Sequence, residues 1–455
     1  MPDSARAQRQ TRSTPGGNPR HLSRRRLLGL GAVGLGLPGG LALGAGAAQL
    51  LRGSDLAATP SALAASPVAT PTSPSAYLES PVRASVDGLL DTMLTARRGP
   101  TTAAGHTFTA LSYDGLFPGP TLRVRPGDTL RIALVNELDK PSNLHVHGMH
   151  VSPVGNGDNV FLHIMPGETF NFEHQIPLDH PAGLYWYHPH LHGDTDEQVA
   201  GGLVGAIVVE GEIDDLPGIA GVPERLLVLQ STEFGPEGQL LTPDQQQTDQ
   251  LVTLVNGALN PALTIRPGET QRWRILNGSA DTFLNLHLDG HQLHQIGSDG
   301  NPLGAVWSRD EIFLSPGERA EILVQAGAPG TYALRSLAWG EGFQAQPEVL
   351  VATFEVAGEA VAPAPLPTDL IPFEDLSQAR IDRQRIVVFE EPSQNPFTVA
   401  IPAGGELTIR TRFRDFTGKF VNHCHILGHE DAGMMGVIEV IERNANASPA
   451  ATPVG

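Results

Sequence analysis

The chain repeats one unit, in which a Pro-Gly-acid turn precedes a stretch of alternating apolar and polar residues. The first unit carries such turns at 126–128 and 166–168, and the second carries them at 267–269 and 316–318. Within 130–134 apolar residues recur at every second position, which places them on one face of a strand. Each unit spans roughly 130 residues of short strands, the size of a Greek-key β-sandwich. The repeat therefore predicts an all-β fold of tandem sandwiches.

A third unit near the C-terminus is shorter than the other two. Its opening strand (386) and its second-half turn (402) are 16 positions apart, whereas the equivalent positions of the second unit (226 and 316) are 90 apart. Roughly 75 residues, about half a unit, are therefore missing. With 51 glycines and 38 prolines, the chain has little capacity for long helices. We expect two complete sandwiches and a truncated third.

The first 47 residues have the features of an export signal. A twin-arginine pattern at 23–28 precedes an apolar Gly/Ala/Leu-rich run, which ends in an Ala-x-Ala-like cleavage pattern at 45–47. This predicts a periplasmic, cell-surface or extracellular protein, and an uncleaved membrane anchor is the alternative. The predicted parts are a signal at 1–47, a Ser/Pro/Ala-rich linker at 48–80, domains at 81–212, 223–360 and 369–443, and a disordered tail at 444–455.

Three histidine pairs have a single residue between their members: His145 and His147, His188 and His190, and His423 and His425. On a strand, side chains two positions apart point to the same face. Three such strands could therefore direct six imidazoles at one site. Imidazole suits copper, and it leaves open positions for an exogenous ligand such as oxygen. Three pairs at corresponding places in a repeat predict a metal site rather than structural histidines.

Cys424 is the only cysteine of the chain, and His429 and Met434 follow it closely. A thiolate, an imidazole and a weak thioether form the ligand set of a blue-copper electron-transfer centre. Because Cys424 lies between His423 and His425, it could join two metal sites through a few covalent bonds. The alternative is a buried structural cysteine beside a Met-containing turn.

Two carboxylates are candidate catalytic groups. Glu430 directly follows His429, and Asp158 lies 11 residues beyond His147 on a Gly/Asn-containing loop. Reduction of oxygen to water needs protons, which a carboxylate near the metal can relay. The alternative for each is an ordinary loop carboxylate.

From about residue 85 to 442, these motifs resemble those of the multicopper oxidase family, which includes laccases and bacterial cuprous oxidases. The resemblance implies cupredoxin-like domains, of which the middle one lacks copper. It also implies up to four copper ions, which couple one-electron oxidation of a phenolic or metal-ion reductant to four-electron reduction of O2 to water. The implied ligands are Cys424, His429 and Met434 for type 1 copper, His145 for type 2, and His147, His188, His190, His423 and His425 for the type 3 pair.

The sequence departs from the family in one motif. The family's His-x-x-His-x-His motif, which would supply one histidine to each copper type, occurs nowhere in this chain. Its expected place falls within the missing half of the third unit. Unless the gap is an artefact of sequencing or of the gene model, we therefore expect copper binding and turnover to be weakened or lost. The alternative function is a copper-binding or structural cupredoxin protein without oxidase turnover.

Two other functions are disfavoured. Copper nitrite reductase needs no histidines on both sides of the cysteine, and a dedicated cuprous oxidase is not supported because there is no Met-rich segment. The net charge of −19 argues against nucleic acid as a partner.

Overall fold

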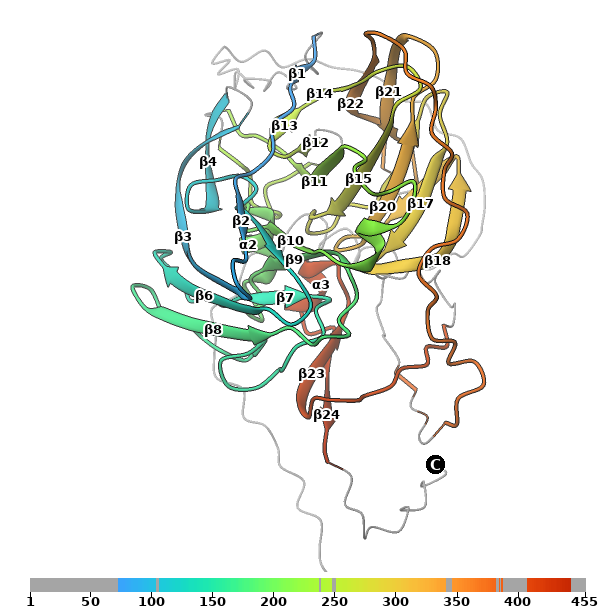
Figure 1. Cartoon of the computed structure of the whole chain (residues 1–455). Helices are drawn as coiled ribbons and strands as arrows, with labels where there is room; N and C mark the ends of the chain where they lie inside the picture. Colours follow the sequence, from blue (N-terminus) through green and yellow to red (C-terminus); the bar gives the residue numbers. More distant parts are fainter. Residues whose placement is uncertain are drawn as a thin grey trace, which may run out of the picture. The chain divides into compact units, whose positions relative to one another are not determined.

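The computed structural model describes residues 73–442 except 104–105, 237–238, 248–250, 341–345, 382–383, 385 and 388–406. The described chain is nearly all β, as predicted, and only short helical segments interrupt the strands (Figure 1). The predicted signal, most of the linker and the tail lie outside the described residues. None of the described helices is long and apolar enough to cross a membrane.

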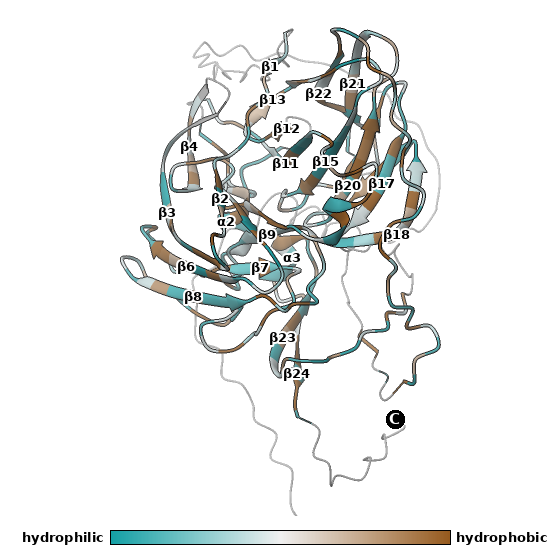
Figure 2. Cartoon of the chain, viewed as in Figure 1, coloured by the Kyte–Doolittle hydropathy of each residue, from teal (hydrophilic) through white to brown (hydrophobic). Residues whose placement is uncertain are grey.

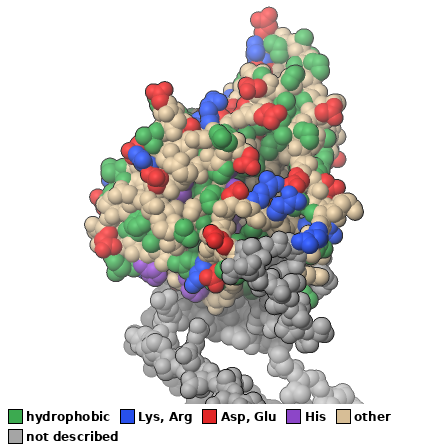
Figure 3. All heavy atoms as spheres, turned by 60° about the horizontal axis from the view of Figure 1, so that its bottom comes forward, with side chains coloured by type: hydrophobic (Ala, Val, Ile, Leu, Met, Phe, Trp, Pro, Cys, Tyr) green, Lys and Arg blue, Asp and Glu red, His purple; other side chains and the backbone are tan. Residues whose placement is uncertain are grey.

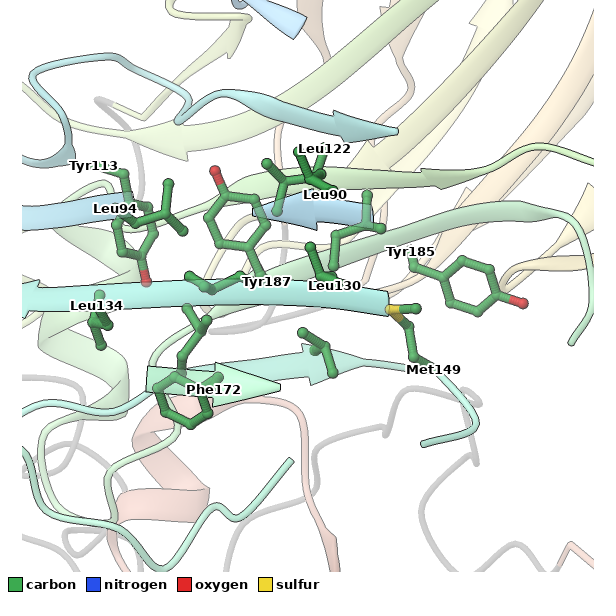
Figure 4. Close-up of a cluster of buried hydrophobic side chains, with 14 of the residues drawn as sticks. Leu90, Leu94, Tyr113, Leu122, Leu130, Leu134, Met149, Phe172, Tyr185 and Tyr187 are labelled. Atoms are coloured by element: carbon green, nitrogen blue, oxygen red, sulfur yellow. The ribbon is translucent and has the colours of Figure 1, made fainter. Parts of the chain in front are cut away.

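The first unit forms two sheets. One has the strand order β2 (Val82–Ala84), β5 (Thr121–Val124), β10 (Gly205–Val209), β9 (Gly183–His188) and β7 (His145–His147). The other has the order β4 (His106–Tyr113), β3 (Leu89–Ala103), β6 (Thr129–Asn136) and β8 (Thr169–Gln175). A buried apolar core includes residues of both sheets, such as Leu130 and Leu134 of β6 and Tyr187 of β9 (Figure 4). Leu130, Ile132 and Leu134 are all fully buried, which confirms the predicted two-residue alternation.

The second unit also forms two sheets, again around a single apolar core. The first has the order β1 (Ser75–Ala76), β14 (Pro261–Ile265), β22 (Val349–Val356), β21 (Gly330–Ser336), β16 (Leu284–Leu288) and β19 (Glu311–Leu314). The second has the order β13 (Ala258–Leu259), β12 (Val252–Val255), β11 (Glu224–Thr232), β15 (Thr270–Asn277), β20 (Arg319–Gln325), β17 (Leu293–Ser298) and β18 (Asn301–Arg309). Figure 2 shows hydrophobic stretches on β17 and β20. Strand β1 lies inside the segment predicted to be linker, so part of that segment belongs to a sheet of the second unit.

The third unit contributes much less structure among its described residues. Strands β23 (Gly418–His423) and β24 (Met435–Val440) form a two-stranded antiparallel sheet, and helix α3 (Leu427–Asp431) lies between them in the chain (Figure 1, red). Ile386 and Val387, which belong to the predicted opening strand, lie outside any strand. Two short helical segments, α2 (Thr195–Ala200) and η1 (Glu212–Asp215), flank β10 in the sequence.

A buried ionic network ties the end of the first unit to the second. Arg272 and Arg274 on β15 both contact Glu321 on β20, and both also reach Asp214 in η1. Arg274 further contacts Glu224 at the start of β11 with a distance of 2.6 Å. On the face shown in Figure 3, basic side chains are interspersed with acidic ones.

Candidate metal centre

The three predicted histidine pairs come together in one cluster. Strand β7 carries His145 and His147, and it pairs antiparallel with β9 so that His145 lies opposite His188. His190 lies two residues beyond the end of β9, while β23 ends at His423. The ring centroids of His190 and His423 are 4.6 Å apart, and those of His147 and His425 are 4.9 Å apart. Strand pairing in the first unit and the hairpin of the third unit therefore supply one common site.

Three of the six imidazoles converge through particular ring nitrogens. His147 Nδ1 lies 3.3 Å from His188 Nε2 and 3.3 Å from His425 Nε2. Trp186 stacks on His188 with ring centroids 4.0 Å apart and on His147 at 5.1 Å. His188 and Trp186 are completely buried, and His425 is nearly so. We call His147, His188 and His425 the imidazole trio.

A second set is built around Glu430. His190 Nε2 lies 3.0 Å from His423 Nε2, so these two nitrogens face each other. On the other side of both rings, the Glu430 carboxylate oxygens lie 3.3 Å from His190 Nδ1 and 3.3 Å from His423 Nδ1. Glu430 is completely buried in helix α3, and the Thr195 hydroxyl donates a 3.4 Å hydrogen bond to it. The carboxylate thus lies at the outer edges of both rings, and the Cys424 carbonyl accepts a 2.9 Å hydrogen bond from His423 Nδ1.

The sixth imidazole, His145, is held by the second predicted carboxylate. Asp158 lies 2.9 Å from His145 Nδ1 and accepts a 3.0 Å hydrogen bond from the backbone N–H of Val146. The contact with Asp158 turns Nδ1 of His145 away from the other imidazoles. Nε2 is therefore the nitrogen that can serve the same site as those imidazoles.

Cys424, His429 and Met434 also lie together. Cys424 Sγ is 3.8 Å from His429 Nδ1, and the Cys424 backbone N–H donates a 3.0 Å hydrogen bond to the Met434 carbonyl. Cys424 is buried, and the side chain of Met434 packs against the same apolar cluster. The second unit contributes Phe283, Phe313 and Trp339 to this cluster.

Burial sets the protonation state of the imidazole trio. It lowers the pKa of His147, His188 and His425 well below the usual imidazole value, and neighbouring imidazoles lower it further. Burial also lowers the pKa of His190, to about 3. Neutral imidazole is the form that binds a metal, so these rings are ready to coordinate near neutral pH.

The two carboxylates remain charged despite their burial. Burial alone would raise the pKa of Asp158, but the charge and hydrogen bond of His145 outweigh it and lower that pKa. Burial would likewise raise the pKa of Glu430, but His423 and His190 lower it. Conversely, Glu430 raises the pKa of His423 against the effect of burial.

Several residues that line the site were not identified from the sequence. Gly317, in a turn of the second unit, has a φ of +81°, and a Cβ atom there would lie 2.6 Å from the His425 ring. Arg319 is buried beside it, and its charge adds to the lowering of the His147 and His425 pKa values. The sequence signal at this place is the Pro-Gly-acid turn at 316–318, which belongs to the repeat and does not indicate a metal site. The unit predicted to lack copper ligands thus closes one wall of the cluster.

The groups of ligand residues fit copper to different degrees. The imidazole trio offers three neutral nitrogens with two separations of 3.3 Å, and the nearly buried His425 leaves its Nδ1 without a hydrogen-bond partner. Cys424 supplies a thiol beside an imidazole, which is a copper-type combination. The set around Glu430 has only two imidazoles whose Nε2 atoms meet.

Comparison with known proteins agrees with this chemistry. Three models described as multicopper oxidase match residues 95–213, 230–354 and 377–444, which together make up more than half of the chain. Multicopper oxidase mco from Staphylococcus haemolyticus is 28% identical over 408 residues, covering 78% of this chain and 89% of that protein. Cell division protein FtsP from Sodalis glossinidius is 30% identical over 326 residues, covering 67% of each chain.

Solved structures support the fold. McoA multicopper oxidase (2F4 variant) from Aquifex aeolicus superposes with a TM-score of 0.67 at 22% identity, covering 80% of this chain and 99% of that one. A multicopper oxidase from Campylobacter jejuni gives a TM-score of 0.64 at 24% identity, covering 81% and 96%. By its sequence models and its relatives, the chain belongs to the multicopper oxidase family, whose cofactor is copper.

Proposed function

We propose that this chain oxidises a phenolic compound or a metal ion by single electrons and reduces dioxygen to water. The observation that carries the proposal is the convergence of six imidazoles from three His-x-His pairs, with Cys424 covalently placed between two of them. We further propose that Cys424, His429 and Met434 hold the copper that accepts electrons, and that the six paired histidines hold the copper that meets oxygen. When bound, copper would supply both the one-electron oxidation and the four-electron reduction.

The protein's own residues would then orient the ligands and exclude water. Asp158 fixes the His145 ring through Nδ1, and Glu430 contacts the outer nitrogens of His190 and His423. Trp186 covers two rings of the imidazole trio with an apolar surface. A ligand set whose rings are oriented in this way requires little rearrangement when it binds a metal.

The same two carboxylates are the groups that we propose to handle protons. Reduction of dioxygen to water consumes protons, and a carboxylate in contact with an imidazole can accept and deliver them. Asp158 touches the imidazole cluster at His145, while Glu430 touches it at His190 and His423. The two carboxylates therefore serve different parts of the cluster.

A second candidate function is a copper-binding or structural cupredoxin protein without oxidase turnover. The observation in its favour is the absence of a His-x-x-His-x-His motif, which leaves several ligand sets one imidazole short. A relative named for cell division, FtsP, shows that proteins similar to this chain are not all named as oxidases. We propose that oxidase turnover in this chain is impaired relative to a member with all four motifs.

We also propose that the protein is exported by its N-terminal twin-arginine signal, which would place the copper sites in the periplasm, at the cell surface or outside the cell. Export of the folded chain would allow copper to be inserted beforehand.

Oxygen uptake by the copper-loaded mature protein tests the proposed function. A phenolic reductant and a ferrous salt should each drive uptake above the rate of free copper at equal concentration. The Cys424→Ser variant should lose this uptake, because its hydroxyl is a poor ligand for copper. No uptake with either reductant, in protein shown to contain copper, would favour the second candidate.

A further inference from the structure

We infer that His174 and Asp158 together bind a buried water molecule, and that His174 thereby acts as a positioning residue for Asp158. The water would hold the Asp158 carboxylate through the oxygen that has only His145 as a partner. The inference deepens the proposed function, because it rests on the proton-handling role proposed for Asp158. It adds a residue and a binding site that this role does not name.

His174 is a buried imidazole without protein partners for its nitrogens. It belongs to strand β8, is only 1% exposed, and has no hydrogen-bond partner at either ring nitrogen among the described residues. Burial lowers its pKa to about 4, so the ring is neutral near neutral pH and has one N–H donor and one acceptor nitrogen. Buried polar atoms of folded proteins nearly always bond to protein or to ordered water. The nitrogens of His174 therefore need a partner that the described protein groups do not supply.

The surroundings of His174 would suit an apolar side chain. Phe172 lies two positions earlier on β8, hence on the same face, and is completely buried (Figure 4). Its ring stacks on His174 with centroids 6.1 Å apart and an interplanar angle of 14°. Leu130 on β6 pairs with His174 and is also completely buried. An imidazole in such a place is unfavourable unless its nitrogens are hydrogen-bonded.

The loop that carries Asp158 is fixed beside His174. The Glu173 backbone N–H donates a 2.8 Å hydrogen bond to the Asn156 carbonyl. This bond joins β8 to the loop next to His174 and two residues before Asp158. The negative charge of Asp158 raises the pKa of His174, and a charged His174 lowers the pKa of Asp158. The two groups are thus close enough to interact, but no direct hydrogen bond joins them, and a bridging water suits such a separation.

Asp158 has the capacity to bond a water molecule. Its Oδ1 atom lies 2.9 Å from His145 Nδ1 and accepts a 3.0 Å hydrogen bond from the Val146 N–H. Its Oδ2 atom lies 3.0 Å from the same His145 nitrogen and has no second donor among the described residues. A carboxylate oxygen accepts about two hydrogen bonds, so Oδ2 can accept one from water. His174 supplies the second polar partner that a buried water requires.

The water would give the carboxylate a second point of attachment. His145 and Val146 hold Asp158 mainly through Oδ1, and a water at Oδ2 would hold it through the other oxygen. A catalytic group whose partners fix both of its atoms keeps the orientation that its role requires. His174 would therefore act on the imidazole cluster only through Asp158.

NMR of the metal-free chain, labelled with 15N at histidine only, tests the water site without copper. We expect one ring nitrogen of His174 to carry a proton, and this N–H to show a nuclear Overhauser contact with a long-lived bound water. His174→Phe keeps an aromatic ring and removes both nitrogens, so it assigns the signal. A His174 N–H without a water contact would overturn the inference.

The same spectra test the positioning role. In His174→Phe the His145 Nδ1–H signal should shift, because its acceptor Asp158 has lost a partner. In His174→Gln, which keeps one donor and one acceptor, the signal should stay closer to its wild-type position. An unchanged His145 signal in His174→Phe would show that His174 only fills space, and would overturn the positioning role. Should His174→Phe not fold, the wild-type spectrum and His174→Gln decide in its place.

Oxygen uptake by the copper-loaded protein gives a second readout. His174→Phe should lower kcat by about 10- to 100-fold, the usual cost of losing an outer partner, with copper content and the KM for the reductant unchanged. His163→Gln, which changes an exposed imidazole of the same unit, should leave kcat unaltered. Equal kcat in wild type and His174→Phe would overturn the positioning role. A wild-type protein that contains copper but takes up no oxygen would overturn the proposed function, while the spectra of the metal-free chain would still decide the inference.

Discussion

Replacing Asp431 should loosen the connection between the third unit and the first. Asp431 ends helix α3, and its carboxylate accepts backbone hydrogen bonds from Gly193 at 2.6 Å, Asp196 at 2.9 Å and Thr195 at 3.3 Å. These N–H groups lie at the start of helix α2, whose own N-cap residue, Asp194, makes no capping bond with its side chain. Asp431 therefore caps a helix of another unit.

The expected loss of stability in Asp431→Ala depends on how exposed the three backbone N–H donors are. Gly193 and Asp196 are half-buried, so water can replace the lost acceptor there, but Thr195 is completely buried. Loss of a cap costs about 1 kcal/mol, and one buried N–H left without a partner costs about 1–3 kcal/mol more. We expect Asp431→Ala to destabilise the α2–α3 connection by about 2–4 kcal/mol. Asp431→Asn keeps one acceptor oxygen and should cost about 1 kcal/mol.

Amide hydrogen exchange at residues 193–196 measures this effect where it occurs. A loss of about 2 kcal/mol accelerates exchange through local opening by about 30-fold. The matched control is Asp415→Ala, which removes an exposed carboxylate that pairs with His150 and should change stability by less than about 0.5 kcal/mol. Unchanged exchange at 193–196 in Asp431→Ala would refute the assignment of Asp431 as the cap of α2.

Three further predictions concern other buried groups. Glu321→Ala leaves the guanidinium groups of Arg272 and Arg274 short of a partner, so urea denaturation should show a loss of about 3–5 kcal/mol, and a loss below about 1 kcal/mol would contradict the network's role. Burial raises the pKa of Glu318 from 4.5 to about 7, so the folded state binds more protons than the unfolded state and the unfolding free energy falls as pH rises through this interval. Glu318→Gln should therefore stabilise the protein by about 1–3 kcal/mol at pH 8 and have little effect at pH 4, and equal effects at both pH values would contradict this. Cys424→Ser should abolish any blue absorption of the copper-loaded protein, and surviving colour would refute Cys424 as the thiolate ligand.

The sequence predicted the fold class and the membership of the cluster because both depend on short-range periodicity. The two-residue spacing of His145 and His147 places both on strand β7, as expected. The spacing of His188 and His190 correctly predicted that both lie at the cluster. Only His188 is on a strand, because β9 ends there. Turn chemistry identified the repeat, and the truncation of the third unit stays a prediction.

The division of the imidazoles into unequal sets could not be predicted from spacing. It depends on which ring nitrogen faces inward, and this is decided by distant partners. Asp158 bonds His145 and Glu430 contacts His190 and His423, while the Cys424 carbonyl also bonds His423 Nδ1. The contribution of the second unit was also missed, because a unit without copper ligands gives no signal of metal chemistry in its sequence. Gly317 acts through the absence of a side chain, which no motif of ligand residues reveals.

Helix α3 brings the third unit into contact with the imidazole cluster of the first. Its last three residues contact three different partners: His429 faces Cys424, Glu430 faces His190 and His423, and Asp431 caps α2. Successive residues of a helix point in different directions, so a single turn can join three elements at once. A single short helix therefore connects Cys424 to the imidazoles of both units. Through these contacts the histidines of the first unit lie against His423 and His425.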